Sequence, residues 1–131
     1  MPSISFVDLL FGHLVGDYLL QNNWMALSKN RNAWRNTVHC IIYTLSIMLF
    51  CRTADWRFVT LVFVSHWIPD YFSIGGIWLK LIRGRSMVEF MHTVDDSQKN
   101  ILTGAFTSIV YVVVDNTIHL LAMWYGWRFI Q

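Results

Sequence analysis

Residues 12–21 read GHLVGDYLLQ and place a histidine, an aspartate and a glutamine inside an otherwise apolar N-terminal segment. A polar group buried in hydrocarbon or in a protein core is costly unless another group pairs with it. His13 and Asp17 are four residues apart, so a helix places both on one face. The stretch therefore predicts a helix whose polar face finds partners elsewhere in the chain.

The composition is that of a small integral membrane protein. Of the 131 residues, 55% are hydrophobic and 14% are charged, whereas about 25% of the residues in soluble proteins are charged. The length suits a single domain, residues 1–131, and a formal charge of +2 is too small to indicate nucleic-acid binding. Cys40 and Cys51 would lie about 16 Å apart on one helix, too far for a disulfide, so both are expected to be packing residues.

Four apolar segments predict four membrane-spanning helices, at about residues 4–27, 37–51, 58–79 and 101–125. A bilayer span needs roughly 20 residues, and all but the second segment reach that length. Pro69 predicts a kink in the third helix, which a membrane helix tolerates when its neighbours bond the freed carbonyl. The expected fold is thus an all-α, integral membrane four-helix bundle with one long polar connection at about residues 83–100.

Aromatic and basic residues predict how this bundle sits in the membrane. Six tryptophans fall near the ends of the apolar segments, where membrane interfaces gather aromatic side chains: Trp24, Trp34, Trp56, Trp78, Trp124 and Trp127. The first and third loops hold Lys29, Arg31, Arg35, Lys80, Arg83, Arg85 and Lys99, whereas the opposite side holds Arg52, Arg57 and Arg128. By the positive-inside rule the basic loops face the cytoplasm and both termini lie on the outer side.

The four-residue spacing between histidine and aspartate recurs along the chain. The other pairs are His66 with Asp70, Asp115 with His119 and, in the polar connection, His92 with Asp96. Random placement would give about 0.5 pairs at the spacing that joins two residues on one helix face, and the sequence holds four. Three of the four pairs lie in apolar segments, which indicates a shared cause.

Two interpretations of the pairs compete. In the first, each aspartate accepts a hydrogen bond from its own histidine, and the neutral pairs join helices structurally. In the second, the pairs converge on a metal ion, because imidazole nitrogens and carboxylate oxygens are ligands of zinc, iron and manganese. Helix bundles build such sites from facing helices. The metal interpretation is preferred, with His13, Asp17, His39, His66, Asp70, Asp115 and His119 as candidate ligands of one or two ions, zinc before iron or manganese.

The depths of these residues raise a difficulty for one shared site. With straight helices that rise 1.5 Å per residue, Asp17 and Asp70 lie about 15–18 Å from the basic side, but His39 lies about 6 Å and His119 about 30 Å from it. Helix tilt, the kink at Pro69 or a later start of the fourth helix would bring them level. Otherwise His39 or His119 falls outside the site.

The same residues carry a resemblance. The pattern Gly12-His13, Gly16-Asp17-Tyr18, Gln21, Trp24, Lys29 resembles the N-terminal signature of a family of small bacterial and phage membrane proteins, domain-of-unknown-function family 3307. The likeness continues through His39, His66, Asp70 and the VVDNTIHLL run, and so covers nearly the whole chain. It implies a bacterial inner (cytoplasmic) membrane protein. Asn116, where the family commonly has glutamine, and the residues after Asp70, where a lysine is often nearby, depart from the pattern.

The histidine and aspartate pattern is also similar, more weakly, to that of membrane-bound metal-dependent hydrolases. That likeness implies a hydrolase that uses a metal-activated water on a lipid or a lipid-linked phosphate or ester. Asp17 or Asp70 would act as general base. Gln21 and Lys29 have two interpretations: both would bind an anionic group of the substrate, or Gln21 would bond a helix backbone and Lys29 would be an anchor at the membrane interface, which is preferred for Lys29. Membrane lipids are the expected partners, nucleic acid is not, and the sequence is compatible with an oligomer.

Two functions of other classes stay open. Intramembrane histidine and aspartate also mark ion pathways, so a small transporter or a conduit for protons or metal ions is the first alternative. A non-catalytic accessory membrane protein, whose polar pairs only stabilise the bundle, is the second. A conduit requires polar residues along the full depth of the membrane, whereas a hydrolase requires them gathered at one level. His92 and Asp96 are expected to be solvated loop residues.

Overall fold

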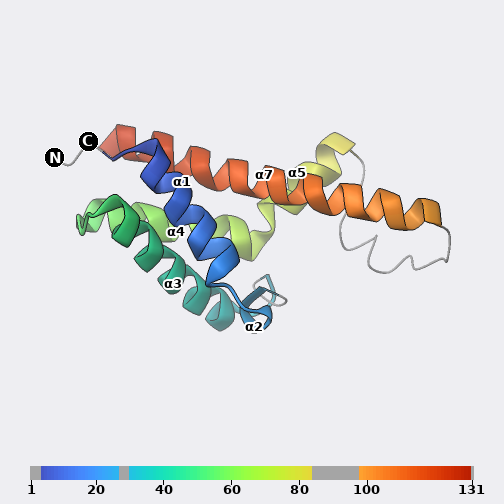
Figure 1. Ribbon diagram of the computed structural model, residues 1–131, viewed down its shortest axis with the longest axis horizontal. Helices are drawn as coiled ribbons and strands as arrows, with labels where there is room; N and C mark the ends of the chain where they lie inside the picture. Colours follow the sequence, from blue (N-terminus) through green and yellow to red (C-terminus); the bar gives the residue numbers. More distant parts are fainter. Residues whose placement is uncertain (1–3, 27–29, 84–97, 131) are drawn as a thin grey trace. The chain divides into compact units, whose positions relative to one another are not determined.

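The computed structural model describes residues 4–26, 30–83 and 98–130, and the regular elements in these ranges are all helical (Figure 1). The expected all-α class is therefore confirmed. The helices are α1 (Phe6–Leu14), the π-helical turn η1 (Val15–Leu19), α2 (Asn23–Ala26), α3 (Ala33–Cys51), α4 (Trp56–Phe72), α5 (Ile74–Arg83) and α7 (Gln98–Ile130). They form two compact units, Met1–Phe72 with His119–Gln131 (the first unit) and Ser73–Ile118 (the second unit).

The first apolar segment is shorter as a helix than the expected span of residues 4–27. The side chain of Ser5 caps α1 by accepting from the backbone N–H of Val7. The helix widens into η1, where the N–H of Leu20 donates to the carbonyl of Val15 at 3.0 Å, and then ends. Gln21 and Asn22 follow, and asparagine side chains compete with helical hydrogen bonds: Asn22 instead caps the short α2 by accepting from the N–H of Met25.

The second helix begins a turn earlier than the expected residue 37. The side-chain oxygen of Asn32 accepts from the backbone N–H groups of Trp34 and Arg35, which is a standard helix N-cap. α3 therefore starts at Ala33, and His39 lies in its second turn instead of at its edge. The helix ends at Arg52, which takes the left-handed conformation (φ 50°) common at helix C-termini.

The third apolar segment, expected as one helix over residues 58–79, is two helices. α4 starts at Trp56, with the carboxylate of Asp55 accepting from the backbone and side chain of Arg57. It continues through Pro69 to Phe72, and the interruption comes at Ser73, whose φ of 49° ends the helix. α5 follows at once, with two early glycines that favour helix poorly. Proline is thus accommodated inside the helix, and the break lies four residues beyond it.

The fourth helix is longer than expected, 33 residues instead of about 25. Over Gly104–Ile130, α7 is long and apolar enough to cross a membrane, and among the described residues it is the one helix of which this is true. Four such spans were expected. The breaks after Leu19 and at Ser73 shorten the first and third segments, and α3 includes too many polar residues.

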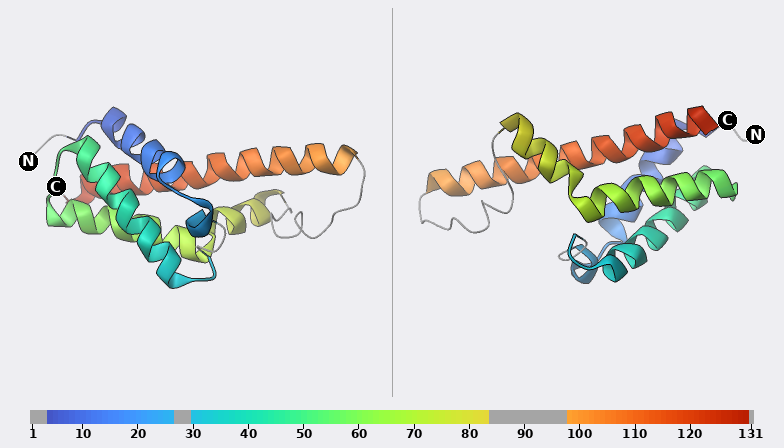
Figure 2. Two further views of the ribbon diagram at one scale, coloured as in Figure 1. Left: turned by 60° about the horizontal axis from the view of Figure 1, so that its bottom comes forward. Right: turned by 180° about the vertical axis from the view of Figure 1, so that it is seen from behind.

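In the first unit, α1, α3, α4 and the C-terminal part of α7 pack around an apolar core (Figure 2). The core residues are Leu9, Tyr43, Ile47, Cys51, Phe58, Val62, Met123 and Trp127. α1 crosses α3 closely at Gly12 and Gly16: a Cβ at these positions would lie 3.1 Å from Cα of Ile47 and 2.8 Å from Cδ2 of Tyr43. The side chain of Ser46 donates to the carbonyl of Gly12 at 2.9 Å. This contact places the polar face of α1 against α3.

Candidate metal centre

On each of the four helices of the first unit, a residue with a polar group lies one helical turn away from an apolar residue of the core. His13 lies four residues after Leu9 on α1, and His66 lies four residues after Val62 on α4. On the two helices that run the opposite way the order is reversed, so Tyr43 comes before Ile47, and His119 before Met123. All four side chains are buried, with exposed fractions of 0–1%. A further turn brings in Asp17, His39 and Asp70.

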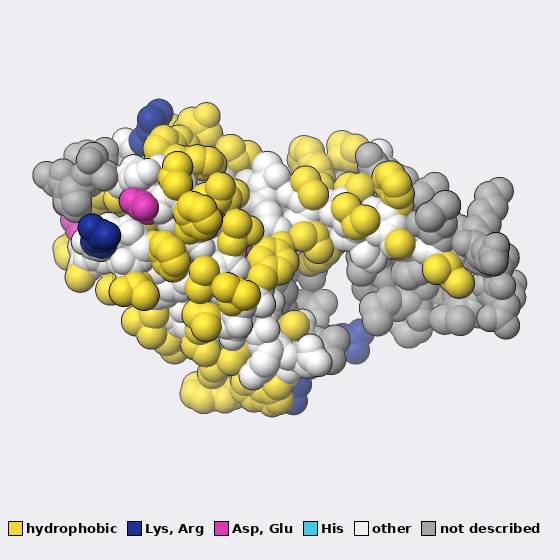
Figure 3. All heavy atoms as spheres, viewed as in Figure 1, with side chains coloured by type: hydrophobic (Ala, Val, Ile, Leu, Met, Phe, Trp, Pro, Cys, Tyr) yellow, Lys and Arg dark blue, Asp and Glu magenta, His cyan; other side chains and the backbone are white. Residues whose placement is uncertain are grey.

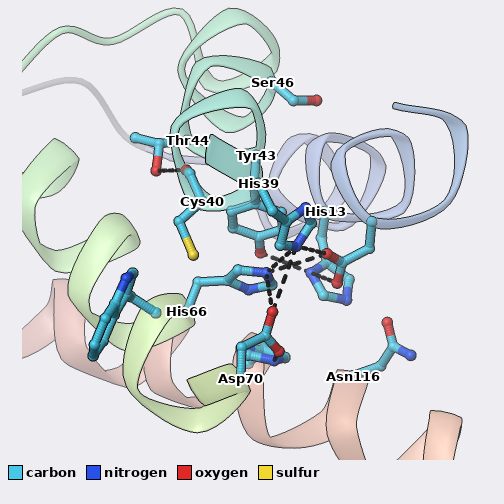
Figure 4. Close-up of polar contacts among 12 residues, drawn as sticks. His13, His39, Cys40, Tyr43, Thr44, Ser46, His66, Asp70 and Asn116 are labelled. Carbon is cyan, nitrogen blue, oxygen red and sulfur yellow. Dashed lines mark hydrogen bonds and ion pairs between the residues drawn. The ribbon is translucent and has the colours of Figure 1, made fainter. Parts of the chain in front are cut away.

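The side chains of His39, His66 and Asp70 point toward one another (Figure 4), and a carboxylate oxygen of Asp17 approaches both histidines. The Nε2 atoms of His39 and His66 lie 2.9 Å apart. Asp17 Oδ1 is 3.2 Å from each of these nitrogens. Asp70 Oδ2 is 3.5 Å from that of His39 and 3.4 Å from that of His66. We call these four residues the central cluster.

Each carboxylate of the central cluster also faces a flanking histidine with its second oxygen. Asp17 Oδ2 lies 3.6 Å from Nδ1 of His13, and Asp70 Oδ1 lies 3.3 Å from Nε2 of His119. The two aspartates thus occupy equivalent positions, with one oxygen at the centre and one toward the flank. Histidines on all four helices are joined through two acidic groups.

This geometry shows that the pair of His13 and Asp17 is not self-contained. If the pairs were self-contained, Asp17 would lie closest to His13, its partner on the same helix. Instead an oxygen of Asp17 lies 3.2 Å from histidines of two other helices and 3.6 Å from His13. The pairs of α1 and α4 therefore converge with His39.

The central cluster has the donor types and spacings of a metal site. Zinc ligands at about 2.0–2.2 Å in tetrahedral geometry lie about 3.3 Å from one another, close to the four nitrogen–oxygen distances. The nitrogen–nitrogen distance is shorter and would open slightly around an ion. Asp17 Oδ1 is buried and makes no hydrogen bond with any described residue, despite its two close nitrogens. Asp17, His39 and His66 could therefore hold a metal ion.

A second set of possible ligands shares members with the first. Cys40, one residue after His39, joins His66 and Asp70 in a buried group whose donor atoms all lie within 4.8 Å of one another. The thiol of Cys40 is buried and donates to Oδ1 of Asn36, with 3.8 Å between sulfur and oxygen. The expectation that Cys40 only packs thus overlooked its place beside the centre.

Tyr43 is the residue of the site that the sequence analysis missed. Its ring stacks on that of His66, with 3.6 Å between ring centroids and 10° between planes. Its hydroxyl lies 2.7 Å from Nδ1 of His13 and donates to Sδ of Met123 at 3.3 Å. With its proton directed to Met123, the phenol oxygen accepts from the Nδ1–H of His13. The signal was available, because Tyr43 follows His39 by four residues and shares its helix face.

Three candidate residues of the sequence remain, Gln21, Asp115 and Lys29. Gln21 follows η1 and is half-buried, and its Nε2 atom is buried without a hydrogen-bond partner among the described residues. Asp115 belongs to the second unit, where its carboxylate packs beside Gly75 of α5. Lys29 lies outside the described residues, as do His92 and Asp96.

The chain belongs to a family of proteins of unknown function, DUF3307, whose model matches residues 5–130. The family indicated by the sequence motifs is therefore confirmed. No curated protein matches the chain. No solved structure matches it either.

Proposed function

We propose that the chain is a metal-dependent hydrolase embedded in the bacterial inner membrane, which acts on a lipid or a lipid-linked phosphate or ester. The observation that carries the proposal is the convergence of two imidazoles and two carboxylates from three different helical elements in the buried centre of the first unit. Such a group is costly to bury without a cation, and hydrolysis is a chemistry that this donor set supports.

The membrane location is supported by the distribution of polar and apolar side chains in the first unit. Its surface carries large exposed hydrophobic residues, among them Leu19, Leu49 and Trp56, which are 74–77% exposed. Hydrophobic side chains cover much of the face in Figure 3. Its centre is polar. Ionisable residues that face the interior of an apolar bundle are typical of membrane proteins.

Helix packing favours the same environment. Gly12 and Gly16 form a G-x-x-x-G pair at the crossing with α3, a common arrangement between membrane helices. α3, with 19 residues, has a length of about 28 Å, close to the roughly 30 Å of a bilayer core. We keep the multi-pass topology inferred from the basic loops, with both termini outside.

In the proposed reaction, His39 and His66 would hold the cation together with the carboxylate of Asp17 or Asp70, which would leave a coordination position for water. Zinc fits the mixed nitrogen and oxygen donors best, and iron or manganese would also accept them. When bound, the cation lowers the pKa of a coordinated water so that hydroxide is available near neutral pH.

The side chains around the cation have separate roles. The carboxylate that the cation leaves free, Asp17 or Asp70, would accept a proton of the attacking water as general base. Each carboxylate keeps one oxygen toward a flanking histidine, Asp17 Oδ2 and Asp70 Oδ1. His13 and His119, beside these oxygens, orient the carboxylates. The buried Nε2 atom of Gln21 has no hydrogen-bond partner among the described residues. It could donate to a phosphoryl or carbonyl oxygen of the substrate. Lys29, in the first of its two interpretations, would bind an anionic substrate group.

The polar residues favour a hydrolase over a conduit because they occupy one level of the first unit. Beyond His13 and His66, the residues of the core itself are apolar: Leu9, Ile47, Val62 and Met123, then Phe58 and Trp127. Ion pathways need polar groups along their length. Access is therefore proposed from the opposite end, where Asp17 retains a side-chain exposure of 10% and Gln21 follows.

Metal analysis of the detergent-purified protein tests the proposal. We expect one or two equivalents of a divalent metal in the wild type and its loss in His66→Ala and Asp70→Asn. Asp55→Asn, in the turn before α4, is the matched control and should retain the metal. Release of fatty acid or phosphate from membrane lipids should depend on the metal. A metal-free wild type, or full metal in both cluster variants, would contradict the proposal.

A second assay separates the hydrolase from the conduit. In proteoliposomes, a conduit would carry protons or metal ions at a rate abolished in Asp70→Asn. We expect no such flux from the wild type. Flux without hydrolysis would overturn the assignment of an enzyme but leave the metal site intact.

A further inference from the structure

α5 has an apolar stripe that is left uncovered. Ile74, Ile77, Trp78, Leu81 and Ile82 follow the spacing of one helix face. From Ile77 onward these side chains are 52–76% exposed. Four large apolar groups in a ten-residue helix are therefore without a partner in the second unit.

The face of α5 that adjoins the stripe is the face that packs. Gly75 and Leu79 are buried, and a Cβ at Gly75 would lie 3.0 Å from a carboxylate oxygen of Asp115 and 3.4 Å from the ring of Tyr111, both on α7. The helix thus uses its small, glycine-containing face against α7. The stripe is a second face, and another surface must cover it.

The charged residues in the sequence of α5 and directly after it are basic. Lys80 is exposed, Arg83 ends the helix, and Arg85 follows, while no acidic residue occurs between Asp70 and Glu89. With ten residues, α5 has a length of about 15 Å, half of what a bilayer span needs. It is also a separate helix, because Ser73 in the left-handed conformation ends α4.

We propose that α5 is an interfacial helix that lies in the plane of the membrane and binds an anionic lipid surface. The stripe enters the boundary between headgroups and acyl chains, Trp78 takes the position typical of interfacial tryptophan, and the basic residues meet lipid phosphates. Lipid is favoured over a protein partner because the helix combines a narrow apolar face with charge of one sign. The inference shares only the membrane location with the proposed function and needs no metal.

Single-cysteine labelling of the full chain in proteoliposomes tests it. In a background with Cys40→Ala and Cys51→Ala, an environment-sensitive fluorophore is attached at Trp78→Cys, Leu81→Cys or Gly76→Cys. Gly76 is the matched control, since a Cβ there has no neighbour closer than 3.8 Å. We expect blue-shifted emission and strong quenching by a shallow lipid nitroxide at 78 and 81, and neither at 76.

The lipid dependence tests the charge. The shift at position 81 should be larger in vesicles with phosphatidylglycerol than in vesicles of phosphatidylcholine alone, and Lys80→Gln should reduce that difference. Equal, water-like emission at 76, 78 and 81 would overturn the proposal, as would stronger quenching by a deep nitroxide than by a shallow one. Energy transfer between labels that falls on dilution with lipid would assign the stripe to a second copy. Metal content, measured on the wild-type protein with Cys40 in place, reports separately on the central cluster.

Discussion

Asp17 and His39 approach within 3.2 Å although they lie on different helices, and they are closer than Asp17 and His13, which share one helix face. The close crossing of α1 and α3 brings them together, because Gly16 leaves room for Tyr43. The candidate metal centre therefore depends on the packing of Gly16 against Tyr43.

Gly16→Ala tests that dependence. The new methyl would lie 2.8 Å from the ring of Tyr43 and 3.2 Å from its Cα, so the helices must separate, at a cost of about 1–3 kcal/mol. We expect a lower thermal midpoint and weaker metal binding. Gly76→Ala, whose methyl meets nothing closer than 3.8 Å, should be neutral or slightly stabilising. Equal midpoints for the two variants would show that the crossing is not tight.

Tyr43→Phe keeps the ring that stacks on His66 and removes the hydroxyl that His13 contacts. Loss of such an orienting group typically lowers metal affinity about 10–100-fold. We expect a decrease in that range, measured by competition with a chelating dye, together with an altered cobalt absorption spectrum. Tyr125→Phe removes the same group from an exposed position and should match the wild type. An unchanged affinity for Tyr43→Phe would leave the tyrosine a packing residue.

Metal removal should destabilise the folded protein. A ligand present at 100 times its dissociation constant stabilises the native state by about 2.7 kcal/mol. A chelator should therefore lower the thermal midpoint of the wild type, and added metal should restore it. His39→Ala, which removes one member of the central cluster, should show no chelator effect. If neither chelator nor added metal changed the thermal midpoint of the wild type, the result would favour the structural interpretation of the pairs.

Ser46→Ala measures the hydrogen bond between α3 and α1. The hydroxyl donates to the carbonyl of Gly12 at 2.9 Å and is buried. Hydrogen bonds between helices in a membrane contribute about 0.6–2 kcal/mol, and a loss in that range is expected in unfolding by detergent. Ser108→Ala deletes a bond of the same length within α7, from Ser108 to the carbonyl of Gly104. It should cost less, and the opposite order would count against an interhelical role for Ser46.

Asp55→Asn tests the pH dependence of stability outside the apolar segments. Hydrogen bonds from Arg57 hold the pKa of Asp55 below its ordinary value. A depressed carboxyl pKa stabilises the native state above the unfolded pKa of about 3.9, and this contribution is lost as the pH falls through the native value. The thermal midpoint of the wild type should exceed that of the variant at pH 7, and the gap should close in acid. A gap that stays constant with pH would exclude the ionised carboxylate as its cause.

Much of the fold follows from the sequence, and the deviations have local causes. The apolar segments gave the helices and their order, but side chains that bond to the backbone moved the ends: Asn32 starts α3 early, and Asn22 starts α2 where one continuous helix was expected. A kink was predicted at Pro69, whereas the helix ends at Ser73. Caps and left-handed residues act over two or three positions, and hydropathy does not detect them.

The candidate site shows a similar division. Spacing along the chain selected His13, His66 and their aspartates, but spacing cannot tell whether a pair is self-contained or shared between helices. Only the crossing of α1 with α3 settles which histidines Asp17 approaches. Tyr43 was not predicted as a site residue because a tyrosine in an apolar segment resembles any other core residue. Its place in the site follows from the contact of its hydroxyl with His13, which the sequence does not show.

The π-helical turn η1 makes the number of residues before Asp17 as important as their identity. One residue deleted between Val15 and Leu19 would let ordinary α winding resume, and each residue of an α-helix turns the chain by roughly 100°. The residues before the deletion would then be rotated relative to the residues after it, and one of the two groups would face new neighbours. A substitution in this turn changes one side chain, whereas a shortened turn would rotate Asp17 away from His39 and His66 without changing the chemistry of any of the three.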